Sequence, residues 1–569
     1  MTRKALRNHS LVRAVSFSVA CISLVVVICV LSATAQDGNA FFQPGSLVVS
    51  RSAYDASPDS VTVGMQLPPN CVVSTGSCVN ATNDGTYPYV FNNAAKTGAN
   101  DGSFGITSEI LLDQITTNGV LINSLEVPNS SQNGVPPMKD QIVTSFSSKS
   151  ELALNLSTDG RYLTFMGYLA SIGSVDVSNS NTPGVVDGTN PVGENFYRVV
   201  AAVDTHGKLR FTLTNAYSGN NGRAAILNNT GGANVMYTSG NAGNGGNPQP
   251  NGIIIAAGAQ ILSPETKAEV AQSPGMPTPV GSFNITQLGH TADKIGKDTN
   301  FRGLTIFDNV LYTTKGSGGN GVNTVYFVDP TGTVCTNTTG VGLPAPDATL
   351  PLSALAYDMT PAVIQAKGLD PNNMCILNGF PTALKSTTSF PFGVWFANST
   401  TLYVADEGNG NVGCATPRPA GCTDATFYSP AAAQTTAGLQ KWILVSGTWQ
   451  LAYTLTAGLD LGQPYVVPNY PAGNNSGTGG TGNPWAPATD GLRNITGVVN
   501  GDGMTATIYA ITSTISGSGD QGADPNKLVV ITDNLSATGP NAPMGESFTT
   551  LRTAGNGEVL RGVSFTPQP

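Results

Sequence analysis

Charged residues are scarce in this chain of 569 residues. Asp, Glu, Lys and Arg together make up 11% of it, and the formal net charge is -9. Beyond residue 35 the Lys and Arg residues form no cluster, so the chain lacks the cations that neutralise phosphates in nucleic-acid complexes. We therefore expect no nucleic-acid partner.

Histidine is also rare, and the usual cysteine motifs of metal and haem sites are missing. The chain has three histidines and contains neither Cys-x-x-Cys nor Cys-x-x-Cys-His. His290 with Asp293 is the one plausible acid-base pair, and neither His206 nor His290 lies beside a nucleophile elbow. These absences disfavour a zinc site, attached haem and a Ser-His-Asp triad.

Long amphipathic segments are lacking too, which indicates an all-β fold. Few windows repeat apolar residues with the helical period. Instead, 67 glycines and many Asn and Asp residues separate short runs of β-branched and aromatic residues.

The N-terminal segment has the pattern of a secretory signal peptide. Four Lys and Arg residues precede the apolar run Ala14–Leu31, and Ala33-Thr34-Ala35 fits a cleavage site. We expect residues 1–35 to be a signal peptide and residues 36–569 to form one domain, which would be secreted, periplasmic or on the cell surface. The alternative is an uncleaved membrane anchor. No second long apolar run follows, which predicts no membrane span after removal of the leader.

Six cysteines remain beyond the predicted leader, and export permits disulfides. Proximity in the sequence favours the pairs Cys71–Cys78, Cys335–Cys375 and Cys414–Cys422. Six cysteines allow fifteen connectivities, so other pairings stay open.

A strand, a polar turn and a second strand with a tyrosine recur along the chain. Leu154–Tyr168 is the clearest copy, because Asp159-Gly160 fits a tight turn between two apolar strands. Similar tyrosines follow at Met236-Tyr237, Leu311-Tyr312, Leu402-Tyr403 and Ile508-Tyr509. Second hairpins at Val199–Thr214, Thr324–Cys335 and Gln440–Leu455 would complete four-stranded units. This repeat predicts a β-propeller.

Six blades are the favoured number. Five inner units begin near Glu151, Gly222, Arg302, Phe392 and Arg493. A sixth blade would combine the two ends of the domain, with Arg561–Phe565 as the inner strand, followed by Leu47–Tyr54 and the hairpin Ile110–Val127. This pairing closes the ring and protects its edges. Seven blades are the alternative if Ile253–Thr286 forms an irregular extra blade.

The motifs GSLVVSRSAY, NNGRAAI, NFRGLTIFDNVLY, GLQKW and RGVSFTP extend over nearly the whole mature chain. With them the chain resembles exported bacterial β-propeller proteins of unassigned activity. It is more loosely similar to streptogramin-lyase-like, gluconolactonase-like and quinoprotein propellers. The resemblance implies a propeller and export, but no reaction or ligand.

Repeated arginines are the first candidate binding residues. Inner strands of a propeller line its central channel, where guanidinium groups could bind a carboxylate or a phosphate. The alternative is a structural role in which each arginine pairs with a carboxylate or with backbone carbonyls. The residues concerned are Arg223, Arg302, Arg493 and Arg561.

Two further candidates lie in loops. Asp406, Glu407 and Asn409 place several oxygen atoms in one short stretch, which would suit calcium, although the spacing does not match the twelve-residue calcium loop. Trp485 lies in a Gly- and Pro-rich loop and could contact a carbohydrate or a peptide.

The sequence favours a noncatalytic binding or scaffold module outside the cell that recognises a small anion, a glycan or a protein. The alternative is a hydrolase (lactonase-like) or lyase that uses a divalent metal in the central channel. Its ligands would come from Glu109, Glu151, Glu194 and Glu407 together with Asn side chains. Convergence of three such groups on one point would favour the enzyme, whereas a channel that is lined by arginine and tyrosine or plugged by apolar residues would favour the binding module.

Overall fold

The chain forms two compact units, Met1–Ala40 and Phe41–Pro569, and every element named below belongs to the second. Among the described residues, no helix has the length and apolar character needed to cross a membrane. The computed structural model describes residues 40–53, 66–67, 79–80, 107–129, 141–145, 151–173, 177, 180–183, 194–214, 216–219, 221–241, 259–262, 282–283, 300–316, 322–335, 340–352, 374–383, 388–411, 436–467, 487–514, 525–555 and 557–569.

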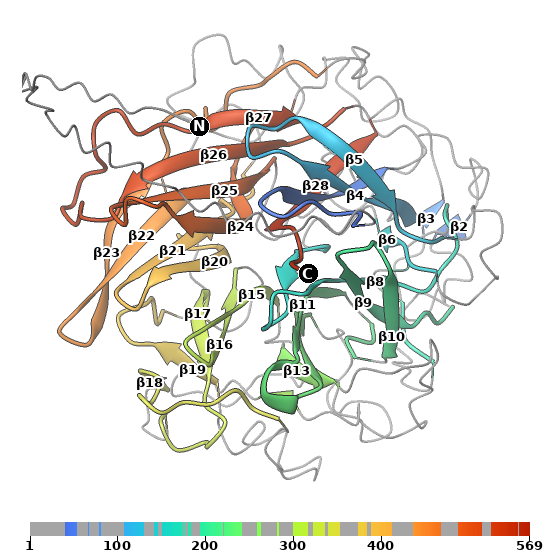
Figure 1. Ribbon diagram of the computed structural model, residues 1–569, viewed down its shortest axis with the longest axis horizontal. Coiled ribbons are helices and arrows are strands. Elements are labelled where there is room, and N and C mark those ends of the chain that lie inside the picture. Colours follow the sequence, from blue (N-terminus) through green and yellow to red (C-terminus); the bar gives the residue numbers. More distant parts are fainter. Residues whose placement is uncertain are drawn as a thin grey trace, which may run out of the picture. The chain divides into compact units, whose positions relative to one another are not determined.

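Six antiparallel blades surround a central axis, which confirms the predicted six-bladed β-propeller (Figure 1). The residues Thr230–Gly232 form a short 3₁₀ turn. From the innermost strand outward, blade 1 contains β28 (Glu558–Phe565), β1 (Leu47–Ala53), β4 (Thr107–Ile115) and β5 (Leu121–Glu126), and blade 2 contains β7 (Asn155–Leu156), β8 (Tyr162–Tyr168), β9 (Arg198–Asp204) and β10 (Leu209–Thr214). Blade 3 contains β11 (Gly222–Asn228), β12 (Val235–Gly240), β13 (Ala259–Leu262) and β14 (Ser282–Phe283), and blade 4 contains β15 (Phe301–Phe307), β16 (Val310–Lys315), β17 (Thr324–Val328), β19 (Met374–Leu377) and β18 (Val341–Gly342). Blade 5 contains β20 (Pro391–Asn398), β21 (Thr401–Asp406), β22 (Gly438–Val445) and β23 (Thr448–Leu455), and blade 6 contains β24 (Gly491–Val499), β25 (Thr505–Ser513), β26 (Lys527–Asn534) and β27 (Thr549–Thr553).

Blade 1 closes the ring by joining both ends of the second unit, as predicted. Strand β1 pairs with β28 from Leu47 opposite Phe565 to Ala53 opposite Glu558, and its other edge pairs with β4. The small strand β6 (Thr144–Ser145) extends this sheet beside β4. Closure therefore leaves neither edge of β1 open.

The second strand of each blade supplies much of the apolar core. In the closed ring these strands lie between two other strands and between two neighbouring blades, so both of their faces are buried. The tyrosines that marked the repeat lie here: Tyr237, Tyr312, Tyr403 and Tyr509 are all at most 6% exposed. The repeat signal therefore reflects packing between blades.

A bulge interrupts the pairing of five innermost strands, at or beside the repeated arginine or at the phenylalanine that replaces it: Arg223, Arg302, Phe392, Arg493 and Arg561. At Gly303, Gly393 and Gly562 a Cβ atom would collide with the backbone of the next blade. The small residue after the arginine is thus required because adjacent innermost strands approach closely at this point.

Blades 3 and 4 differ from the prediction in their outer strands. The expected hairpin Thr324–Cys335 is wrong: β17 ends at Val328, and its partner is β19, with β18 pairing beyond it in parallel. After β17 the chain turns on Asp329, whose carboxylate accepts the backbone N–H groups of Thr331 and Val334. The stretch Ile253–Thr286 contains β13 and β14 of blade 3 and forms no seventh blade among the described residues.

The disulfide Cys335–Cys375 is present and joins the turn after β17 to β19. The other four predicted disulfide cysteines, Cys71, Cys78, Cys414 and Cys422, lie outside the described residues.

The two faces of the ring differ in their connections. Each innermost strand from β7 to β24 ends in a short turn to its second strand, as at 157–161, 308–309, 399–400 and 500–504. The second strands return to the opposite face, where connections such as 54–106 and 407–437 are much longer. We call these the short-turn face and the long-connection face.

Candidate functional site

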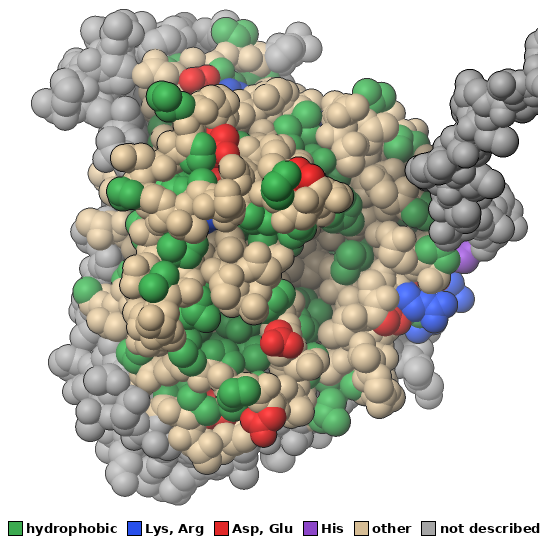
Figure 2. Space-filling view, turned by 60° about the vertical axis from the view of Figure 1, so that its left-hand side comes forward, with side chains coloured by type: hydrophobic (Ala, Val, Ile, Leu, Met, Phe, Trp, Pro, Cys, Tyr) green, Lys and Arg blue, Asp and Glu red, His purple; other side chains and the backbone are tan. Residues whose placement is uncertain are grey.

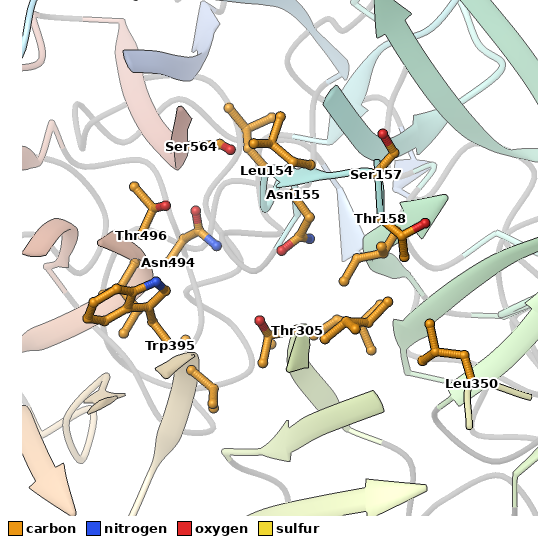
Figure 3. Close-up of a pocket in the computed structure, with 18 of the residues that line it drawn as sticks. Leu154, Asn155, Ser157, Thr158, Thr305, Leu350, Trp395, Asn494, Thr496 and Ser564 are labelled. Carbon is orange, nitrogen blue, oxygen red and sulfur yellow. The ribbon is translucent and has the colours of Figure 1, made fainter. Parts of the chain in front are cut away.

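A cavity of about 480 Å³ lies on the axis among the innermost strands (Figure 3). Its lining extends from Gly303, Gly393 and Asn494 beside the bulges to residues of the short turns, such as Thr158 and Asp308. The cavity therefore opens toward the short-turn face. Its volume falls within the range of about 300–1,000 Å³ typical of small-molecule sites.

One position per blade forms a ring around this cavity, which we call the axial ring. In blades 1 and 3 to 6 it is the third residue after the bulge position, so the bulge fixes its direction. In blade 2 the corresponding residue is the third after Leu152, which precedes β7. The six members all line the cavity and are Asn155, Ile226, Thr305, Trp395, Thr496 and Ser564.

Two amide side chains are held by the neighbouring blade. Asn155 Nδ2 donates to the carbonyl of Ala225 at 3.2 Å, and Asn494 Oδ1 accepts from the backbone N–H of Val563 at 2.7 Å. Each amide thus has one group engaged, and Figure 3 shows both amides directed into the cavity. The cavity receives an acceptor from Asn155 Oδ1 and a donor from Asn494 Nδ2.

Trp395 lies on the wall between blades 5 and 6. A Cβ atom at Gly497 would lie 2.8 Å from its indole ring, so the absence of a side chain there makes room for the tryptophan. On the same sheet the ring stacks near Tyr403, with centroids 5.8 Å apart. The indole is therefore held in one orientation at the edge of the cavity.

The four predicted arginines lie together near the axis, but they do not line the cavity. With Glu151 and Glu407 they form what we call the charged layer, in which every side chain is at most 4% exposed. The layer lies at the bulges, between the cavity and the long-connection face. Its members are Arg223, Arg302, Arg493, Arg561, Glu151 and Glu407.

Glu407 joins two blades through ion pairs. Its carboxylate lies 3.4 Å from Arg302 Nη2 and 3.6 Å from Arg493 Nε. Arg493 also donates to Ser513 Oγ at 3.1 Å. The alternative structural role of the arginines therefore matches the geometry better than the anion-binding role.

Glu151 is held by hydroxyl and backbone donors on the opposite side of the layer. Its carboxylate accepts Thr144 Oγ1 at 2.7 Å, the N–H of Ser145 at 3.0 Å and the hydroxyl of Tyr168. Burial raises the pKa of Glu151, and the charge of Arg561 opposes this. Burial also raises the pKa of Tyr168 well above its usual value.

Burial lowers the pKa of all four guanidiniums, and it brings those of Arg493 and Arg561 to about 10. The mutual repulsion of the cations lowers the pKa of Arg223 and Arg493 further, whereas Glu407 opposes the shift. All four stay charged at neutral pH, so each requires its local partners. Arg223, for example, donates to the carbonyl of Phe301 at 2.9 Å.

Blades 2 and 5 carry no arginine at the bulge position. Phe392 occupies it in blade 5, and the guanidinium of Arg302 lies 5.8 Å from the centre of its ring. Leu152 occupies the position in blade 2 and is fully buried. Apolar groups thus complete the layer around the ion pairs.

The three predicted calcium ligands have separate partners. Asp406 accepts the backbone N–H groups of Phe390 at 2.9 Å and Gly408 at 3.0 Å, and burial raises its pKa to about 7. Asn409 Oδ1 accepts the N–H of Asn411 at 2.9 Å, while Glu407 belongs to the charged layer. The calcium site stays a prediction.

Within the described ranges, His, Cys, Asp and Glu side chains form no group of three or more that could hold a metal ion. Of the glutamates considered for a metal centre, Glu151 and Glu407 lie in the charged layer, Glu109 lies on β4 and Glu194 is exposed. His206 lies in the turn between β9 and β10. His290, Asp293 and Trp485 lie outside the described residues.

The sequence analysis did not identify the axial ring. A usable signal exists, because aligning the repeats on the Arg-Gly dipeptides and reading two residues beyond the glycine gives Thr305 and Ser564 directly. The ring mixes amide, hydroxyl, aliphatic and aromatic side chains, so it has no motif of its own.

No family model and no curated protein matches this chain. One similar solved structure is NanB with Optactamide, which is 7% identical over 73% of this chain and 62% of that chain, with a TM-score of 0.31. Another is a mutant of the NanB sialidase of Streptococcus pneumoniae, which is 7% identical over 82% of this chain and 68% of that chain, with a TM-score of 0.31. A quinonprotein alcohol dehydrogenase-like protein of Bacteroides thetaiotaomicron is also similar (10% identity, 92% and 91%, TM-score 0.25). The chain thus spans 62% of the length of NanB in the first of these structures, and the similarity concerns the fold alone.

Proposed function

We propose that the protein is an exported, noncatalytic binding module that takes a small ligand into its central cavity. The observation that carries this proposal is the composition of the cavity wall. Asp308, at the rim, is the only charged residue among the described lining residues, and these include no histidine or cysteine. General acid-base or nucleophilic catalysis would need such groups within reach of the ligand.

The charged layer supports the same proposal. Its buried ion pairs occupy the axis between the cavity and the long-connection face. The cavity is therefore closed on that side and does not continue as a channel. The metal-dependent hydrolase is less well supported, because Glu407 pairs with two arginines and Asp406 accepts backbone N–H groups.

Export is the second part of the proposal. It is supported by the leader-like segment before residue 36 and by the disulfide Cys335–Cys375, because disulfides persist in oxidising compartments.

A blocked cavity tests the binding proposal. Thr496→Trp would place a large side chain in the cavity, whereas Val498→Trp places it on the same strand at a 41% exposed position that is not part of the lining. Both variants and the natural protein would be screened by thermal shift against a library of small anions, saccharides and peptides. Mass spectrometry would then follow the fate of each hit.

We expect a ligand to raise the unfolding midpoint of the natural protein and of Val498→Trp, but not that of Thr496→Trp. It should also be recovered chemically unchanged. Conversion of the ligand to a product, or equal stabilisation of all three proteins, would contradict the proposal.

A further inference from the structure

We infer that the ligand of the cavity is a short, uncharged saccharide. This inference rests on the proposed function and specifies its ligand class. It follows from the polar groups that the cavity wall leaves available, from the restriction of charge to Asp308 at the rim and from the apolar surface between the polar groups.

The available side-chain groups both donate and accept. Asn155 Oδ1 and Asn494 Nδ2 face the cavity while the other half of each amide is fixed by the next blade. The hydroxyls of Thr305, Thr496 and Ser564 form no hydrogen bond with any other part of the described chain. Saccharide hydroxyls likewise donate and accept, so they match such a mixed set.

Backbone groups add to this set. Each innermost strand pairs with another strand on one side only. Neighbouring blades use some groups of its second edge, such as the carbonyl of Ala225 and the N–H of Val563. Such an edge presents neutral N–H and C=O groups in alternation. They can bind hydroxyl groups without favouring a ligand of either charge.

Apolar surface lies between the polar groups, as the C–H faces of a sugar ring require. Ile226, Ile306 and Ile495 contribute aliphatic wall. Trp395 borders the cavity in Figure 3, and its indole N–H is not engaged by any described residue. Because Gly497 and Tyr403 already hold the indole of Trp395 in place, contact between this indole and a ligand would cost little side-chain entropy.

Other ligand classes fit less well. A small anion would need a cation in the wall, but the guanidiniums of the charged layer are buried behind it and paired. A hydrocarbon would leave the amides and hydroxyls of the wall without partners, which is unfavourable once water is excluded.

Isothermal titration with a defined panel tests this inference. The neutral probes are maltose, cellobiose, xylobiose and N,N′-diacetylchitobiose, and the charged probes are glucuronic acid, citrate, phosphate and glucosamine. Thr305→Val and Thr496→Val remove one hydroxyl each at nearly constant volume. Thr550→Val is the matched control, because Thr550 is exposed on β27 and is not part of the lining.

We expect one neutral probe to bind, and each wall variant to weaken its binding about fivefold to tenfold, as loss of one hydrogen bond predicts. Thr550→Val should bind like the natural protein. Trp395→Phe should abolish most of the ligand-induced change in tryptophan fluorescence.

The failures of the two proposals are distinguishable. A charged or apolar ligand that binds the natural protein but not Thr496→Trp would overturn the saccharide inference and leave the binding module standing. Binding of a neutral saccharide that Thr305→Val, Thr496→Val and Thr496→Trp all leave unchanged would overturn the inference, because the sugar would then lie outside the cavity.

Discussion

At the scale of single residues, the bulge position decides what occupies the axis. A residue there points into the charged layer, and the residue three positions later points into the cavity. Arginine at the first position and a neutral residue at the second separate charge from the ligand site. This arrangement lets the propeller keep buried ion pairs without placing a charge in the axial ring.

Glu407 should be the most sensitive residue of the charged layer. Glu407→Gln removes the carboxylate shared by Arg302 and Arg493 and leaves two buried cations without their counter-ion. We expect the free energy of unfolding to fall by about 3–5 kcal/mol. Denaturant unfolding would measure it, with Glu126→Gln as the control because Glu126 is exposed. Equal stability of the two variants would show that the pairs contribute little.

Asp406 should make the protein more stable in mild acid. Burial raises its pKa from 3.8 to about 7 in the folded state, and Glu407 and Asp490 add to the shift. Between these values the folded state holds a proton that the unfolded state has lost. The free energy of unfolding therefore decreases as the pH rises from about 4 to about 7. Glu546, whose pKa burial also raises to about 7, contributes with the same sign.

Thermal unfolding between pH 5 and pH 7.5 measures this dependence. Asp406→Asn resembles the protonated acid, so it should partly remove the dependence of the unfolding midpoint on pH. Adding Glu546→Gln should reduce this dependence further. A midpoint that rises over this interval in the natural protein would contradict the assigned sign.

At the scale of elements, structure that depends on neighbouring residues was predicted better than pairing between strands that are distant in the sequence. The hairpins were predictable because a turn such as Asp159-Gly160 and a buried strand such as Leu163–Tyr168 are adjacent in the sequence. The outer strands β13, β14 and β19 are short and lie far along the chain from their partners. Nothing in their local sequence specifies the partner, so blades 3 and 4 were incomplete in the prediction.

The site was harder to predict than the fold, for a geometric reason. Its wall takes one residue from each of six strands, and neighbours in space such as Asn155 and Ser564 are far apart in the sequence. Arg302 and Glu407 illustrate the same difficulty, because their pairing depends on how two blades meet. Sequence spacing predicted the arginines, but it could not choose between binding and structural pairing.

The disulfide should stabilise blade 4, whose outer strands β19 and β18 have only four and two residues. Cys335–Cys375 links residues 40 apart in the sequence, and closing such a loop in the unfolded chain corresponds to about 4 kcal/mol in the chain-entropy model. We expect the Cys335→Ser, Cys375→Ser double variant to lose about 2–4 kcal/mol in denaturant unfolding. Reductant should lower the stability of the natural protein at least as much. An unchanged midpoint in the double variant would contradict a stabilising role.

At the scale of the whole molecule, charge is sparse, because Asp, Glu, Lys and Arg make up only 11% of the chain. Figure 2 shows a face on which hydrophobic groups and uncharged side chains or backbone cover most of the surface, with scattered acidic groups and one group of Lys and Arg side chains at its edge. The strongest concentration of charge in the innermost strands lies instead in the buried charged layer. Electrostatic steering is therefore expected to contribute little to ligand capture.

Closure of the ring depends on a single strand pair between the two ends of the second unit. Strand β28 covers one edge of β1, and its Arg561 donates to Ser52 Oγ at 3.1 Å and to the carbonyl of Ser145 at 3.4 Å. Removal of residues 558–569 would expose seven residues of β1 as an open edge. Open strand edges pair with other chains.

We therefore expect the protein without residues 558–569 to self-associate and to unfold at a lower temperature, as measured by light scattering and calorimetry. A synthetic peptide of residues 558–569 should restore both the light scattering and the midpoint of the full-length protein, because it can replace β28 beside β1 by strand addition. A scrambled peptide of the same composition is the control, since it keeps the charge but loses the register that places Arg561 against Ser52. If the truncated protein stays monomeric and equally stable, closure by β28 is dispensable, and the six blades must be held by packing between their faces alone.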